Sequence, residues 1–151
     1  MKSPTLAIRK GVYDALSPLE IDSVVIPIFD SVVNPEVTIP TFMGGKAYII
    51  LSSQSNNETT DNKCDFRQNA NITIDIFVKF NKGYGGQFAS DLISNSIQYV
   101  IQPFEGIGID VSPHFQILKT TKIVDLQFAE HTPTQSVYRV ELIYAFDTFQ
   151  K

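Results

Sequence analysis

The sequence predicts an α+β fold: a single mixed, mostly antiparallel sheet with two helices packed on one face. Between Asn71 and Phe80, apolar side chains alternate with polar ones, with Phe77 as the one exception. This period-2 pattern is typical of a strand that buries one face. Between Phe88 and Ile101, apolar residues recur at helical spacing until Pro103 ends the pattern. The chain has 151 residues, so we expect residues 1–151 to form a single domain.

The first half of the chain predicts one helix and two strands. Ser3 and Pro4 suit a helix start, and an apolar stripe then predicts a helix from Pro4 to Leu16. Val24–Phe29 reads as a short strand at a sheet edge, because Pro27 cannot donate to a hydrogen-bond ladder. After an irregular connection over 30–45, the apolar run Ala47–Leu51 predicts a central strand.

A long polar stretch follows that strand. Residues 52–65 contain no aliphatic or aromatic side chain, which predicts a long polar loop or hairpin arm. Such an arm could become ordered on contact with a neighbouring subunit. Its candidate subunit or partner contacts are Asn56, Asn57, Glu58, Asp61 and Lys63.

Two strands are predicted to close the sheet, over 117–128 and 136–147, joined by a hairpin connection at 129–135. In the second strand, the even-numbered residues from Tyr138 to Phe146 are apolar, so the odd-numbered face should be the outer one. Ile143 lies on this outer face and Phe77 on that of the 71–80 strand, where water is expected. Either a neighbouring subunit covers this face or the apolar residues pack locally, and we take Phe77 and Ile143 as candidate contacts.

Composition argues against several functional classes. The net charge is -4 with a pI near 5.0, and no basic patch of the kind that binds nucleic acid is present. Cys64 is the only cysteine, so neither an intramolecular disulfide nor a cysteine-based metal site is expected. Apolar runs are too short to span a bilayer. We expect no cofactor, no metal ion and no membrane segment.

The glycine-rich turn Gly83–Gly86 is the one feature that resembles a catalytic motif. It departs from the dinucleotide pattern G-x-G-x-x-G, because Phe88 occupies the last position, and it lacks the Gly-Lys-Ser/Thr of a P-loop. It also departs from the RNA-recognition motif, which needs Phe and Val where Gly86 and Gln87 stand. His114 and His131 are isolated and read as solvated loop residues. We therefore predict a flexible turn and no enzyme, with a small-ligand or nucleotide-binding module as the alternative.

The layout resembles the bacteriophage tail-completion family, the tail-terminator or head–tail joining proteins of long-tailed phages. The segments that carry the resemblance are a short helix ending at Tyr13-Asp-Ala-Leu16, the stretch Val25–Asp30, a proline-rich link to Pro40, the strand Tyr48–Leu51, the long strand 71–80, a glycine-rich turn into a helix over 86–101, and two closing strands. The chain departs from the pattern in its longer connection before Ala47 and in the polar stretch 52–65.

The resemblance implies a ring-forming structural subunit of the virion tail or neck, made in the cytoplasm of the host bacterium. Its partners would be copies of itself, most often as a hexamer, together with the tail tube and the head connector. DNA would pass through the ring without specific binding, and an acidic lumen would ease its passage. A portal-attached adaptor or neck ring, with a dodecamer as the expected assembly, is the alternative within the virion.

Overall fold

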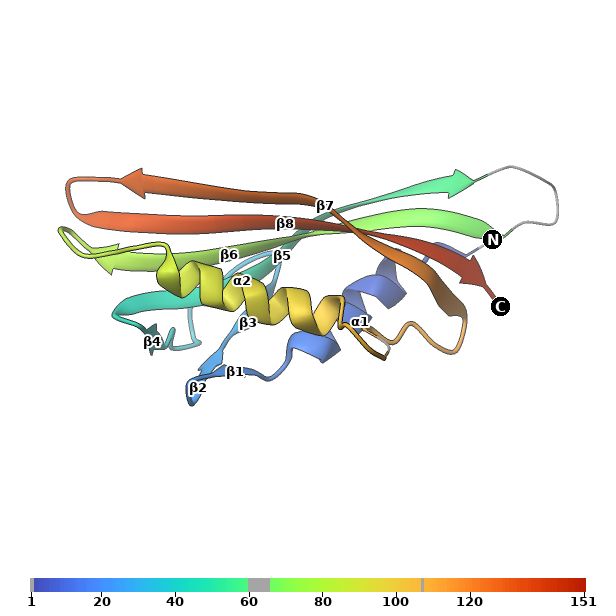
Figure 1. The fold of residues 1–151 in the computed structure, drawn as a ribbon, viewed down its shortest axis with the longest axis horizontal. Helices are drawn as coiled ribbons and strands as arrows, with labels where there is room; N and C mark the ends of the chain where they lie inside the picture. The colour runs from blue at the N-terminus through green and yellow to red at the C-terminus, as the bar shows by residue number, and fades with distance from the viewer. Residues whose placement is uncertain (1, 60–65, 107) are drawn as a thin grey trace.

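The computed structural model describes residues 2–59, 66–106 and 108–151 (Figure 1). Its elements follow in this order: α1 (Thr5–Leu16), β1 (Leu19–Ile21), β2 (Val24–Ile26), β3 (Ile28–Asp30), β4 (Thr41–Phe42), β5 (Gly45–Thr59), β6 (Arg67–Asn81), α2 (Phe88–Ile101), β7 (Phe115–His131) and β8 (Gln135–Gln150).

One sheet organises the molecule, with strand order β3-β5-β6-β8-β7 and β4 paired to the start of β5. All its pairs are antiparallel except β3 with β5, which is parallel. β1 and β2 form a separate two-stranded hairpin. The prediction of a mixed, mostly antiparallel sheet is therefore confirmed.

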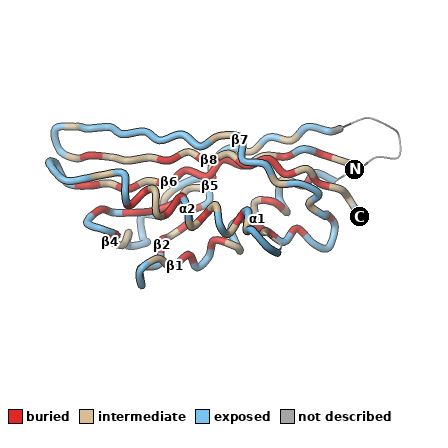
Figure 2. The backbone as a smooth tube through the Cα atoms, in the orientation of Figure 1, coloured by how far each residue is buried: buried red, intermediate tan, exposed pale blue. Residues whose placement is uncertain are grey.

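The core lies between one face of this sheet and the two helices, as Figure 2 shows by burial. In β6 and β8, the paired residues Ile74 and Leu142 are fully buried, and so are their even-numbered neighbours on the same face. α1 contributes Ile8 and Val12 to this core, and α2 contributes Ile93 and Ile97. The predicted packing of both helices on one face is confirmed.

Helix boundaries agree closely with the sequence patterns. α1 begins at Thr5, one residue later than predicted, and Pro4 takes the position before it. α2 covers Phe88–Ile101, and the backbone N–H of Gln102 still donates to the carbonyl of Gln98 at 2.9 Å. Because each helix contacts the sheet through one apolar stripe, the 3.6-residue period was a sufficient guide to both.

The predicted single strand Val24–Phe29 is wrong, because Pro27 divides it into two strands in different sheets. β2 pairs with β1, whereas β3 pairs with β5 at the sheet edge. Pro27 has no N–H to donate, but its carbonyl accepts the N–H of Ile49 at 2.9 Å. The edge position predicted from this proline is confirmed for β3.

The polar stretch is also corrected: residues 52–59 continue β5 and pair with β6. Polar cross-strand bonds replace apolar contacts there. Asn56 Nδ2 donates to Gln68 Oε1, and Gln68 Nε2 donates to the carbonyl of Lys2 at 2.7 Å. The far end of this hairpin extends beyond both helices (Figure 1). The hairpin-arm interpretation thus fits 52–59, whereas residues 60–65 lie outside the described part of the chain.

Candidate assembly surfaces

No helix packs on the second face of the sheet in the described part of the chain, and we call this second face the open face. Its apolar side chains come from four neighbouring strands. Leu126 is 51% exposed and Phe128 is 43% exposed. Tyr48 and Ala145 are buried, whereas other apolar residues of the open face are half-buried, among them Ile50, Phe77, Val124, Val137 and Ile143.

In β7 the polar side chains face the helices and the apolar side chains face outward, which is the opposite of what is usual for a strand with one face covered by helices. Its polar side chains point toward α2: Asp125 accepts from Lys122 Nζ at 2.9 Å, and Gln127 Nε2 donates to Asp91 at 2.6 Å. The register pairs Leu126 with Glu141 and Phe128 with Arg139, which are open-face residues of β8. The apolar side of this edge strand therefore faces outward, where a monomer would bury nothing.

An ion-pair cluster lies in the middle of the open face. Arg139 donates to Asp75 Oδ1 through Nη2 at 2.8 Å and Nε at 3.2 Å, and also contacts Glu141 at 3.1 Å. Its guanidinium lies 5.7 Å from the ring centroid of Phe77 and 5.4 Å from that of Phe128. The guanidinium of Arg139 is thus held by hydrogen bonds and lies close to two aromatic rings. In protein interfaces, charged groups of this kind determine which partner fits, and aromatic rings supply apolar contact area.

The two predicted apolar contacts both lie on the open face. Phe77 stacks on Tyr48 with centroids 5.2 Å apart, so part of its burial comes from local packing. Ile143 pairs with Thr73 on one side and with Val124 on the other, and remains half-buried. The register thus brings Phe77 and Ile143 to one surface.

The predicted polar contacts lie elsewhere, on the arm formed by residues 52–59 of β5 and 67–73 of β6. Asn57 and Glu58 are exposed on it, whereas Asn56 is half-buried and bonded to Gln68. Asp61 and Lys63 lie outside the described residues. The arm and the open face are parts of one sheet, but the arm's contacts are polar.

β7 also leaves a long free edge. The N–H of Thr132 donates to the carbonyl of Gln135 at 2.8 Å, which makes these two a hydrogen-bonded pair. Alternation along the ladder then directs the backbone groups of Asp125, Gln127 and Ala129 away from β8. Bulges after Ile117 and Lys122 interrupt the first half of the strand, whereas the second half is regular and can accept another strand.

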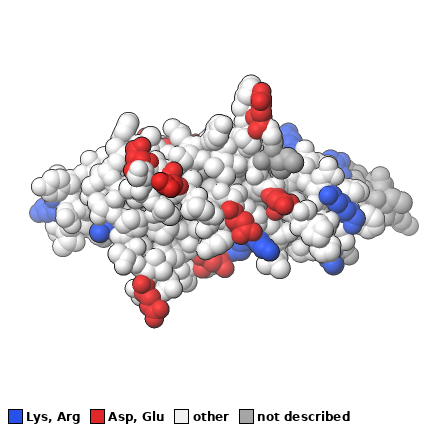
Figure 3. All heavy atoms as spheres, turned by 90° about the horizontal axis from the view of Figure 1, so that it is seen from below, with Lys and Arg blue, Asp and Glu red and all other residues white. Residues whose placement is uncertain are grey.

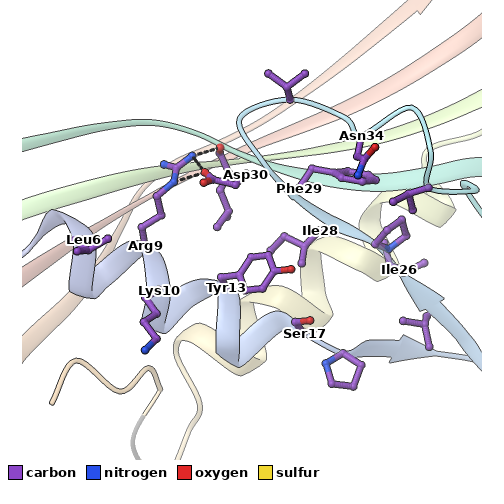
Figure 4. A pocket seen from close by; sticks show the side chains of 16 residues that line it. Leu6, Arg9, Lys10, Tyr13, Ser17, Ile26, Ile28, Phe29, Asp30 and Asn34 are labelled. Carbon is purple, nitrogen blue, oxygen red and sulfur yellow. Dashed lines mark hydrogen bonds and ion pairs between the residues drawn. The ribbon is translucent and has the colours of Figure 1, made fainter.

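A separate apolar groove of about 720 Å³ runs between α1 and the β2–β3 segment (Figure 4). Leu6 is 78% exposed and Val32 is 75% exposed beside it. Arg9 crosses the groove wall, where it pairs with Asp30 and donates to the carbonyls of Leu51 and Ser52. Those carbonyls belong to the bulge where β5 leaves β3, so Arg9 has a structural role that the sequence pattern did not indicate.

The glycine-rich turn is built for packing. Gly85 has φ +143, and a Cβ there would lie 2.7 Å from the Tyr138 ring. At the start of α2, the nearest acidic side chain is Asp91 in the first turn, which would repel a phosphate. His131 ends β7 and hydrogen-bonds Ser136 at 2.9 Å, so its prediction as a loop residue is wrong.

Charge is distributed unevenly over the surface. Seen from below, acidic side chains lie over the middle of the molecule, together with some basic ones, and further Lys and Arg lie toward both ends (Figure 3). The described residues include no group of three His, Cys, Asp or Glu side chains that could hold a metal ion. None of the described helices is long and apolar enough to cross a membrane.

No protein-family model matches the chain, and a search of curated proteins finds no significant match.

The sequence pattern placed Arg139 on the outer face with Ile143 but did not indicate its ion pair with Asp75. It also did not identify Leu126 and Phe128 as open-face residues. For Leu126 and Phe128, the alternation over 117–128 separates the side chains into two faces. It does not tell which of these two faces the helices cover. That choice depends on the pairing of β7 with β8, which the structure supplies.

Proposed function

We propose that this chain is a non-enzymatic structural subunit that assembles with copies of itself into a ring, at the head–tail junction of a tailed bacteriophage. The ring would complete or terminate the tail, join it to the head connector and leave a channel for DNA. The observation that carries the proposal is the open face, with its outward apolar residues Leu126 and Phe128. The overall layout, which resembles the tail-completion family, supplies the place in the virion.

The open face fits an assembly subunit better than a solitary protein. Apolar residues on an uncovered sheet face would lose contact with water if a second chain packed there, at about 25 cal/mol per Å² of apolar area. The Asp75–Arg139 cluster would set the register of that contact, because a mismatched partner would leave a charge unpaired.

The sheet edges favour a head-to-tail arrangement. β7 forms one edge, and β3 with the arm of β5 forms the other, so the two edges differ in length and sequence. Contacts between unlike surfaces close into a ring when the rotation from one subunit to the next is a simple fraction of a turn. β5 and β7 run in opposite directions. If β7 of one subunit paired with the β5 arm of the next subunit in the same orientation, the two sheets would therefore join as one antiparallel sheet.

The charge balance suits a DNA channel. The chain has 16 acidic and 12 basic residues, and an acidic lumen repels the phosphate backbone instead of holding it. Non-specific passage of DNA, without stable binding, is therefore the expected behaviour.

Native mass spectrometry of the purified chain tests the proposal directly, with negative-stain microscopy of the same sample. We expect a closed ring. A hexamer favours the tail terminator, and a dodecamer favours a portal-attached adaptor. A monomer at all concentrations and salt conditions would refute assembly through the chain alone.

Two variants identify the surface. Phe77→Ser and Ile143→Ser change the open face and should shift the ring toward monomer. Tyr99→Ser is the matched control, because Tyr99 is 72% exposed on α2, on the opposite side of the sheet. Thermal shift with a panel of nucleotides tests the ligand-binding alternative, and stabilisation that Gly86→Val abolishes would favour it.

A further inference from the structure

Two lysines face each other across a shallow pocket at one end of the open face. Lys46 of β5 and Lys79 of β6 are direct cross-strand partners. The connection between β3 and β4 covers them from one side. The pocket has a volume of about 440 Å³ and is lined by Val33, Thr38, Ile39, Lys46, Tyr48 and Lys79.

The positive charge of this pocket is not balanced within the described residues. No carboxylate lines it, and neither lysine forms an ion pair there. Lys79 Nζ lies 5.3 Å from the centroid of the Tyr48 ring. On its other side, Lys79 pairs with the uncharged Val137 of β8, and the nearest acidic residue along this line of cross-strand partners is Glu130 of β7, two strands away from Lys79. Like charges that face each other across a ladder destabilise it, so an anion between them would be bound favourably.

The walls restrict which anion fits. Val33, Ile39 and Tyr48 make much of the pocket apolar, and the two ammonium groups are its strong donors. Ammonium groups bind a phosphate or a carboxylate as point charges, but a free phosphate would leave the apolar walls without a partner. A carboxylate adjacent to an aromatic or aliphatic side chain satisfies both the charge and the walls.

Among the described residues, the segment that presents such a pair with its apolar side chain most exposed follows α2. Phe104 is 95% exposed, more than any other large apolar residue described, and the exposed Glu105 follows it. Glu105 forms no ion pair with the described residues. Both residues follow α2, which covers the helix-bearing face, whereas the lysine pocket lies on the open face. The sheet separates the segment from the pocket within one subunit.

We propose that the Lys46–Lys79 pocket of one copy receives the Phe104–Glu105 segment of the next copy. This inference rests on the self-assembly proposed above and specifies one of its contacts. Phe104 fills the space against Val33 and Ile39, and the Glu105 carboxylate lies between the two ammonium groups. Because the two surfaces are unlike, the contact is heterologous and propagates from copy to copy.

Photocrosslinking identifies the residues of a neighbouring copy that Phe104 contacts. A full-length chain with p-benzoylphenylalanine at position 104 is irradiated, and the crosslinked peptides are mapped by mass spectrometry. We expect intermolecular crosslinks to peptides that contain Val33, Ile39 or Tyr48. Crosslinks to α1 or to β3, which border the apolar groove, would overturn the assignment while leaving assembly intact.

A charge swap tests the ion pair. Lys46→Glu and Glu105→Lys should each raise the protein concentration needed for half-maximal assembly about tenfold, as expected for a close interfacial ion pair. The triple variant Lys46→Glu, Lys79→Glu and Glu105→Lys should return it to within about threefold of the original chain, since both pocket charges and the charge between them are then reversed together. Lys10→Glu, at an exposed lysine outside the pocket, is the charge control.

The outcomes separate this contact from the proposed function. Rings that form equally well in the single variants would overturn the lysine-pocket contact and leave the ring standing. Loss of assembly in both single variants without recovery in the triple variant would also overturn it. If the unmodified chain never assembles, both the ring and this contact are refuted.

Discussion

Replacement of Tyr144 by Phe should stabilise the protein, against the usual effect of a core substitution. Tyr144 lies on β8 and is fully buried, and its hydroxyl has no hydrogen-bond partner among the described residues. A buried hydroxyl without a partner costs roughly 1–3 kcal/mol. Tyr144→Phe removes that group and keeps the ring, and the oxygen-sized void offsets part of the gain. We expect a net increase of about 1 kcal/mol in the free energy of unfolding.

The same substitution should change how the free energy of unfolding depends on pH under alkaline conditions. Burial, and secondarily the charge of Asp125, raise the pKa of Tyr144 from 10.0 to about 12. In the unfolded chain the phenol ionises near its ordinary value, so between these two pKa values the folded state binds more protons. Stability is therefore complete below the unfolded pKa and falls as pH rises toward 12.

Urea unfolding at neutral pH, and then across the range from the unfolded pKa upward, measures both effects on the free energy of unfolding, and thermal unfolding at neutral pH gives the melting temperature. At neutral pH the melting temperature should rise by roughly 2–4 °C for a chain of this size. Above the ordinary tyrosine pKa, the original chain should lose stability more steeply than Tyr144→Phe. Tyr99→Phe is the control, because Tyr99 is 72% exposed and should change neither limb. A loss of more than about 1 kcal/mol in Tyr144→Phe would show that the hydroxyl has a partner, such as a buried water.

Two further substitutions test the packing of the turn and of the open face. Gly85→Ala should destabilise more than Gly86→Ala, because the two glycines have φ of +143 and +148 but only at Gly85 would an added Cβ meet the Tyr138 ring, at 2.7 Å. Equal losses in thermal unfolding would mean that backbone strain alone requires glycine. Arg139→Met should cost about 2 kcal/mol in urea unfolding, less than a fully buried pair, since Asp75 is 9% exposed but Arg139 is 37% exposed. Arg139→Lys should recover only part of this loss, and full recovery would exclude a need for the guanidinium fork.

The elements that sequence predicted best are those covered on one side by apolar packing. The 71–80 segment and the even-numbered positions from Tyr138 to Phe146 both alternate, because one face meets the helices and the other does not. Burial of one face of a strand makes apolar residues recur at every second position of the sequence. Burial of one face of a helix makes them recur about every 3.6 residues.

The β5 side of the arm could not be predicted in this way, because residues 52–59 carry only polar side chains. Asn56, Gln68 and the carbonyl of Lys2 form a hydrogen-bonded series that has no apolar period. A run of polar residues reads as a loop unless the partner strand is known. The cluster of Asp75 and Arg139 was hidden for a related reason: 64 positions separate the two residues in sequence, and only the β6–β8 register brings them together.

β7 links the fold to the proposed function. If the chain were built only to fold as a monomer, the apolar side of β7 would be expected toward α2 and the polar side toward water. The observed arrangement is the opposite: Asp125 and Gln127 bond to side chains around α2, while Leu126 and Phe128 face outward. The backbone ladder to β8 and the polar bonds to α2 both hold the strand, and its outward side chains have few partners within the fold beyond the contact of Phe128 with Arg139. Their apolar character is accounted for when the open face is a contact surface, which makes the orientation of this edge strand the strongest structural support for assembly.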